Sequence, residues 1–113
     1  MVKECKTADD FREVLNNSKE KAIFVFKHST ACPVSRNAMK EYTAFASRAD
    51  QAEYRQVLVR ENRALSDLIA EETGIRHESP QVILFYQGRP AWICTHRSIT
   101  GDSLGRQLER MGL

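Results

Sequence analysis

Residues 22–35 of the chain read AIFVFKHSTACPVS, and this stretch decides the fold. Residues 22–26 are a short continuous apolar run, which is typical of a strand buried on both faces of a sheet. Apolar residues at helical spacing follow Pro33, and proline is favoured in the first turn of a helix. Cys32 therefore lies at a predicted strand-to-helix turn, near the positive end of the helix dipole. That position stabilises the thiolate, which is the nucleophilic form of cysteine.

A serine, Ser35, stands where a two-cysteine redox motif has its second thiol. This predicts that Cys32 forms a mixed disulfide with another molecule and that an outside thiol resolves it. Two roles stay open for Ser35: a hydrogen bond to the Cys32 thiolate, or a bond to backbone in the first helical turn. The alternative for Cys32 is a buried and unreactive small apolar residue.

Length and composition indicate the broad class of protein. The chain has 113 residues, so we expect a single domain over residues 1–113. A net charge of +2 with interspersed signs argues against a nucleic acid or a membrane surface as partner. No apolar stretch predicts a transmembrane helix or a signal peptide, so a cytoplasmic location is expected.

The cysteines, Cys5, Cys32 and Cys94, are odd in number, which favours reduced thiols over a disulfide framework. The cysteines and histidines show no paired ligand spacing, so we expect no metal site. Cys5 is expected to be a surface thiol or to have no role. Cys94 is expected on one face of a strand with Trp92 and His96, as filler rather than as a resolving thiol.

The rest of the chain alternates helical and strand patterns. Capping residues before apolar residues at helical spacing predict helices over residues 7–15, 62–73 and 100–111, in addition to the one from Pro33. Further strands are predicted over residues 54–59, 81–86 and 91–96, the last two as a hairpin. This order predicts an α/β fold with a mixed four-stranded sheet flanked by helices. Cys32 would lie at the carboxyl ends of the parallel strands, where ligands bind in such sheets.

The element order, the cysteine at the first strand-to-helix turn and the proline before the hairpin resemble the thioredoxin fold. Three segments are more closely similar to the monothiol bacilliredoxin family, the YtxJ-like proteins. They are Cys-Pro-Val-Ser at 32–35, His-Glu-Ser-Pro-Gln at 77–81 and Gln-Gly at 87–88. The chain departs from the family at Ala31, where threonine is usual, and its threonine is Thr30 instead.

The resemblance implies a thiol-disulfide oxidoreductase of low-molecular-weight thiol metabolism. The family is associated with bacillithiol, which replaces glutathione in some bacteria. Cys32 would attack a client protein that carries bacillithiol as a mixed disulfide, and free bacillithiol would then resolve the enzyme. The partners implied are bacillithiolated client proteins and the low-molecular-weight thiol, which is a co-substrate; no bound cofactor is expected.

The resemblance also assigns supporting residues. Thr30, Pro33 and Ser35 would support the thiolate. Pro80 would be a cis-proline whose preceding backbone, at Ser79, pairs with an extended substrate; the alternative is a trans proline that opens a strand.

Charged and polar residues near the motif are weaker candidates. Arg76, and after it His77, would face Cys32 in a polar loop and bind the thiolate or the carboxylates of bacillithiol; a solvated loop is the alternative. Lys27 and His28 leave the first predicted strand toward the motif, and a positive charge there would favour the thiolate. We expect Lys27 to be exposed to solvent.

Two other functions remain open. An iron–sulfur carrier is one, because some monothiol glutaredoxins bridge a cluster between subunits, although Pro33 stands where those proteins usually have glycine. The other is a catalytically silent thioredoxin-like interaction module, in which Cys32 is unreactive.

Overall fold

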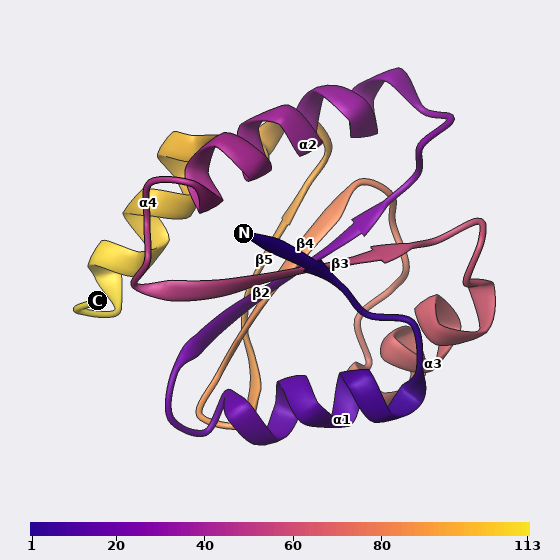
Figure 1. The fold of residues 1–113 in the computed structure, drawn as a ribbon, viewed down its shortest axis with the longest axis horizontal. Coiled ribbons are helices and arrows are strands. Elements are labelled where there is room, and N and C mark those ends of the chain that lie inside the picture. The colour runs from indigo at the N-terminus through magenta and orange to yellow at the C-terminus, as the bar shows by residue number, and fades with distance from the viewer.

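Five strands form one mixed sheet with helices on both faces in the computed structural model, which describes residues 1–113 (Figure 1). The strands are β1 (Val2–Glu4), β2 (Ala22–His28), β3 (Ala52–Leu58), β4 (Gln81–Tyr86) and β5 (Arg89–Thr95). Their order in the sheet is β1-β3-β2-β4-β5. β1, β3 and β2 run parallel, and β4 and β5 are antiparallel to their neighbours.

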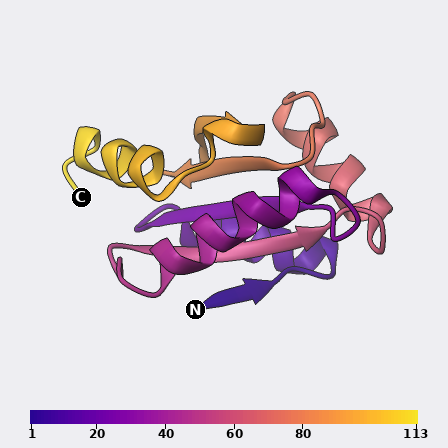
Figure 2. The same ribbon diagram turned by 90° about the horizontal axis from the view of Figure 1, so that it is seen from above.

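The helices separate into two layers. α1 (Ala8–Asn17) and α3 (Arg63–Thr73) cover one face, while α2 (Pro33–Ala46) and α4 (Gly101–Arg110) cover the other. Seen from above, α2 lies over β2 and β3, and α4 lies over the side of β4 and β5 (Figure 2). A short 3-10 turn, η1 (His96–Ser98), joins β5 to α4.

All seven residues of β2 are buried, as the apolar run predicts, because β2 is the central strand and both of its faces are covered. Alternate residues supply the two cores. Phe24 and Phe26 pack in the core under α2 and α4, and Ile23 and Val25 pack in the core under α1 and α3.

Local capping sets the helix boundaries. Thr7 and Thr100 each form a capping box with the residue three positions later. Asn62 accepts a bond from the backbone of Leu65 to begin α3. Gly74 ends α3 with a left-handed backbone at φ 71°, a conformation that glycine adopts without steric cost.

Two expectations about the strands are wrong. The sheet has five strands rather than four, because Val2–Glu4 pairs in parallel with β3, opposite residues 54–56. Three residues are too few to show an alternating pattern, so this strand has no signal of its own in the sequence. His96 does not continue the last strand: it begins η1 with φ 53° and does not share a strand face with Cys94.

No helix is both long enough and apolar enough to cross a membrane.

Candidate functional site

Cys32 is the N-cap residue of α2, with Pro33 in the first turn. Its backbone is extended (φ −98°, ψ 121°), and its side chain makes no capping hydrogen bond. The residue is partly exposed, whereas Cys5 and Cys94 are buried. The sulfur of Cys32 is therefore the one thiol that is both accessible and placed at the positive end of a helix.

Ser35 fixes the turn that carries Cys32. Its side chain is fully buried, and its hydroxyl accepts a hydrogen bond of 3.0 Å from the backbone N–H of Ser29. The same oxygen lies 2.7 Å from Nδ1 of His28. The hydrogen bonds of Ser35 thus go to the end of β2 and the following loop rather than to Cys32, and its backbone partner precedes the helix.

His28 stands behind this turn. It is buried, and its ring packs edge-on against Phe26 with centroids 5.5 Å apart. Burial lowers the pKa of His28 against the opposing effect of Glu61, and Arg36 adds to the lowering. The neutral imidazole is therefore favoured. Arg36 in turn donates to the carbonyl of Thr30 at 3.1 Å, so the exposed Thr30 is held through its backbone.

The peptide bond between Ser79 and Pro80 is cis, as the resemblance predicts. Pro80 directly precedes β4, and its carbonyl accepts a hydrogen bond of 3.0 Å from the backbone N–H of His96. The hydroxyl of Ser79 is buried without a hydrogen-bond partner. The role expected for the Ser79 backbone, pairing with substrate, stays a prediction.

Lys27 is completely buried, so the expectation that it is exposed is wrong. Its ammonium donates to the carbonyl of Ser66 at 3.0 Å and lies 3.3 Å from Nδ1 of His77. Burial lowers the pKa of Lys27 to about 8, against the opposing effect of Asp67. Partners from α3 and from the loop at residues 75–79 enclose the ammonium, and this is why the side chain is not solvated.

His77 is tied to this lysine. The Ser66 hydroxyl also lies 3.2 Å from its Nδ1, and burial and the Lys27 charge both lower the pKa of His77. Gln81, which is paired with Lys27 across β2 and β4, donates through Nε2 to the carbonyl of Arg76 at 3.1 Å. Its Oε1 is buried without a partner.

We call Lys27, Ser66, His77 and Gln81 the lysine cluster. It holds the loop at residues 75–79 against α3, on the sheet face opposite α2. Arg76 is exposed, and no hydrogen bond joins the side chains of Arg76 or His77 to Cys32.

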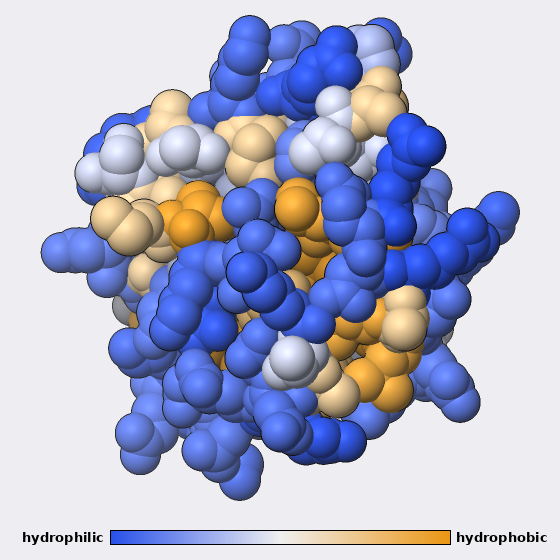
Figure 3. All heavy atoms as spheres, turned by 45° about the vertical axis from the view of Figure 1, so that its right-hand side comes forward, coloured by the Kyte–Doolittle hydropathy of each residue, from blue (hydrophilic) through white to orange (hydrophobic).

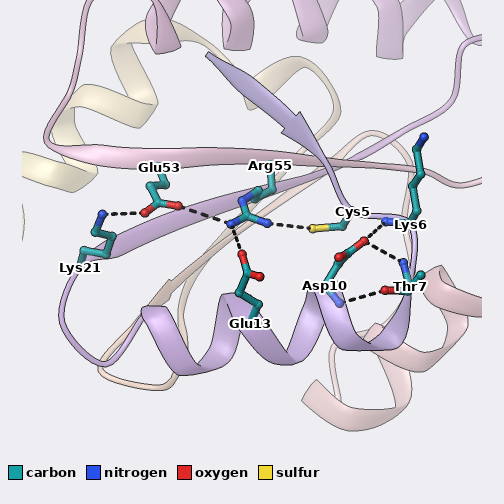
Figure 4. Close-up of polar contacts among 8 residues, drawn as sticks. All are labelled: Cys5, Lys6, Thr7, Asp10, Glu13, Lys21, Glu53 and Arg55. Carbon is teal, nitrogen blue, oxygen red and sulfur yellow. Dashed lines mark hydrogen bonds and ion pairs between the residues drawn. The ribbon is translucent and has the colours of Figure 1, made fainter.

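The other two cysteines have structural environments. Cys5 is 1% exposed, so it is not a surface thiol; its sulfur lies 3.8 Å from Nη1 of Arg55, which also pairs with Glu13 at 3.0 Å (Figure 4). Burial raises the pKa of Cys5 despite this guanidinium. Cys94 belongs to the core under α2 and α4, as expected of filler, and burial raises its pKa as well.

No three His, Cys, Asp or Glu side chains gather into a group that could hold a metal ion.

A parallel strand that leads into a helix headed by cysteine, with a cis-proline before the neighbouring antiparallel strand, defines a protein of the thioredoxin-like α/β class. Solved thioredoxins have the same fold. The protein NaTrxh of Nicotiana alata matches with a TM-score of 0.77 at 22% identity, covering 96% of this chain and 90% of that one. The thioredoxin of Trypanosoma brucei brucei matches with a TM-score of 0.79 at 13% identity, over 98% and 90% of the two chains.

A structure described as that of a candidate oxidoreductase with a thioredoxin fold is 34% identical, with a TM-score of 0.84, over 93% of this chain and 91% of that one. The family model described as monothiol bacilliredoxin BrxC matches residues 3–104. The chain belongs to the monothiol bacilliredoxin family.

Proposed function

We propose that this protein is a monothiol thiol-disulfide oxidoreductase that removes bacillithiol from client proteins in the cytoplasm. The observation that carries the proposal is the contrast among its thiols: Cys32 is accessible at the N-terminus of α2, Cys5 and Cys94 are buried, and position 35 holds a serine. Membership of the bacilliredoxin family supports bacillithiol as the co-substrate.

The reaction has two exchange steps. In the first, the Cys32 thiolate attacks the bacillithiol sulfur of the client's mixed disulfide. The client sulfur leaves as a thiolate and takes a proton from solvent, while bacillithiol stays bound to Cys32. In the second, the thiolate of free bacillithiol attacks the bacillithiol sulfur of this adduct. Cys32 leaves as a thiolate, and the product is bacillithiol disulfide. One free bacillithiol is therefore oxidised for each client thiol released, while the bacillithiol taken from the client stays at the disulfide level.

Ser35 makes an outside thiol necessary in the second step. A hydroxyl cannot form a disulfide, and this one is already bonded to Ser29 and His28. The client would approach over Thr30 and Pro33 and along the Ser79 backbone beside Pro80. Arg76 and His77 would line the outer side of that approach.

The test is a turnover assay in which a client that carries bacillithiol is mixed with the protein and free bacillithiol, and release of the client thiol is followed. We expect wild type to release it and Cys32→Ser to release none. Cys94→Ser is the matched control, because it removes a buried thiol, and it should keep most of the activity. Equal loss in both variants, or the same rate on a glutathionylated client, would contradict the proposal.

Ser35→Cys tests the monothiol mechanism. Its new thiol would lie one helical turn from Cys32, and after oxidation we expect an internal disulfide, seen by mass spectrometry of the intact protein. In a single exchange, the new thiol should release bacillithiol from Cys32 without free bacillithiol, and further turnover then requires a thiol that reduces the internal disulfide. Absence of the internal bond would show that residue 35 cannot reach Cys32 and that the serine does not stand for a resolving thiol.

A further inference from the structure

A groove of about 440 Å³ lies directly beside the cysteine motif. One wall is the first half of α2 and the other is the turn after β5. We call it the α2–η1 groove, and the residues that matter in it are Pro33, Asn37, Lys40, Glu41, His96 and Arg97. Pro33 is the neighbour of Cys32, so a small group attached to the Cys32 sulfur has this groove within reach.

The residues that line the groove carry a net positive charge. Lys40 and Arg97 are both exposed cations, one from each wall. Its single acid, Glu41, already accepts a hydrogen bond of 2.8 Å from the backbone N–H of Gly101, at the N-terminus of α4. The positive end of that helix therefore balances the Glu41 carboxylate, and the two cations remain available to a ligand.

The turn that carries Arg97 is fixed beside the site. His96 adopts a left-handed backbone at φ 53°, which is uncommon for a residue other than glycine, and such residues occur preferentially at functional sites. Its N–H donates to the carbonyl of Pro80 at 3.0 Å. The η1 turn is thus tied to the backbone of the buried cis-proline, and it lines the same groove as Pro33 of the motif. The β2 and β3 arrows point to the right in Figure 1, and Figure 3 turns that side of the molecule toward the viewer. The face seen there is mainly hydrophilic, with small separate apolar areas.

We propose that the α2–η1 groove binds the carboxylate-bearing part of the low-molecular-weight thiol attached to Cys32, with Arg97 and Lys40 pairing with its carboxylates. The proposal rests on the proposed function and names a subsite for it. It places carboxylate recognition on the α2 side of Cys32 rather than on the loop at residues 75–79. In that loop Nδ1 of His77 is already engaged by Lys27 and Ser66.

A single exchange step isolates this contact. The Cys32 thiolate attacks one sulfur of a small symmetric disulfide, the sulfur–sulfur bond breaks, and one half leaves as a thiolate while the other stays on Cys32. Three probes differ mainly in charge: the disulfide of mercaptosuccinate, which carries two carboxylates on each half, the neutral disulfide of mercaptoethanol, and the cationic cystamine. Adduct formation is followed by mass spectrometry of the intact protein.

The preference is the rate of adduct formation with the dicarboxylate probe divided by the rate with the neutral probe. We expect this ratio to be higher for wild type than for a small free thiol of similar basicity. The double variant Lys40→Ala Arg97→Ala should lower that preference by about twofold to thirtyfold, because two exposed ion pairs are lost. High salt should lower it in wild type and change little in the variant. The rate with the neutral probe should stay within about twofold in the variant.

Two further variants separate this contact from general effects. Arg12→Ala Lys19→Ala removes the same net charge from exposed positions on α1 and in the turn after it, on the opposite face, and should leave the preference intact. His96→Gly keeps a residue that tolerates the left-handed backbone and removes the imidazole. It should keep most of the preference because both cations remain, and a loss as large as that in Lys40→Ala Arg97→Ala would overturn their assignment.

An unchanged preference in Lys40→Ala Arg97→Ala overturns the groove, as does an equal loss in the α1-side control. A loss on Arg76→Ala instead would place the carboxylates on the loop and also overturn it. Failure of the proposed function looks different: Cys32 would then react with none of the three probes faster than the small free thiol does.

Discussion

Lys27 and His28 are consecutive residues at the end of β2, and they send buried polar groups to opposite faces of the sheet. His28 lies on the α2 side, beside Phe26, and its ring contacts Ser35 in the turn that carries Cys32. Lys27 lies on the α3 side, where the lysine cluster holds the loop that leads to Pro80. Two neighbouring residues of one strand therefore anchor two segments: His28 anchors the turn that contains Cys32, and Lys27 anchors the loop that leads to the cis-proline.

His28 and Lys27 differ in how much their burial lowers the stability of the fold. Burial lowers the pKa of both side chains, and for His28 this favours the neutral imidazole, which carries no charge into the core. Lys27, with a pKa of about 8 in the folded protein, is mostly charged at that pH. A shift from the ordinary 10.5 to about 8 corresponds to about 3 kcal/mol of unfavourable free energy for the charged form. The cis-proline loop is therefore anchored by a side chain that lowers the stability of the fold, whereas the anchor of the motif turn carries no such destabilising charge.

We expect the largest effect from Lys27→Met, which keeps the apolar stem of the side chain, removes its buried charge and so tests whether that charge lowers stability. We expect the free energy of unfolding at pH 7 to rise by about 2–3 kcal/mol, because replacing a buried charge with a well-packed apolar side chain relieves its desolvation. Exchange activity should fall, because His77 and its loop lose an anchor. Urea unfolding and the turnover assay measure both. A variant that is less stable and fully active would contradict the account.

The pH dependence of stability tests the cost of the buried Lys27 charge in a second way. The folded-state pKa of Lys27 is depressed to about 8, so the unfolded chain holds this proton more tightly. Below pH 8 the lysine is charged in both states and the full cost is present; between pH 8 and about 10.5 the folded protein loses the proton first and stability gains. The difference in unfolding free energy between Lys27→Met and wild type should therefore shrink across this window. A difference that is constant from pH 7 to 10 would contradict the low pKa.

On the other face, His28→Phe keeps a ring against Phe26 and removes the hydrogen bond to Ser35. We expect a loss of about 1–2 kcal/mol in unfolding free energy, with slower exchange, because the Ser35 hydroxyl loses its imidazole partner and the turn at residues 29–32 loosens. Ser35→Ala is the matched partner variant. The double variant should lose less than the sum of the two single losses, since both remove one shared bond. Additive losses would show that the two side chains act separately.

The smallest effect is expected for Ser66→Ala in the lysine cluster. His77 loses one hydroxyl partner but keeps the Lys27 ammonium, and the Ser66 carbonyl that accepts from Lys27 is backbone. We expect about 1 kcal/mol or less in stability and a change below about twofold in exchange rate. A loss of activity as large as that of Lys27→Met would mean that Ser66, rather than the lysine, places His77.

Local patterns account for most of the fold that the sequence predicts. The apolar run of β2, the caps at Thr7 and Thr100, and the stop at Gly74 each depend on neighbours within a few residues, so they can be read directly. β1 could not be predicted in this way. It spans three residues, and its pairing partner in β3 lies about fifty positions along the chain.

The site divides along the same line. Cys32 at the head of α2 and the cis-proline at position 80 follow from motifs, and the structure has both. The burial of Lys27 could not be predicted, because its partners Ser66 and His77 are 39 and 50 residues away. Ser66 carries no signal of its own in the sequence, and Gln81 enters the sequence analysis only as the last residue of the segment at 77–81 and the first of a predicted strand. The only signal in the sequence is that Lys27 directly follows an unbroken apolar run. That pattern fits a buried lysine and the exposed end of a strand equally well.

The most direct measurement of the central claim is a single-turnover reaction without free bacillithiol, quenched with acid and analysed by mass spectrometry of both intact proteins. We expect the bacillithiolated client to become a free thiol while this protein gains one bacillithiol, which peptide mapping places on Cys32. A disulfide between Cys32 and the client would mean that the other sulfur is attacked. Bacillithiol on Cys5 or Cys94, or no transfer at all, would contradict the account.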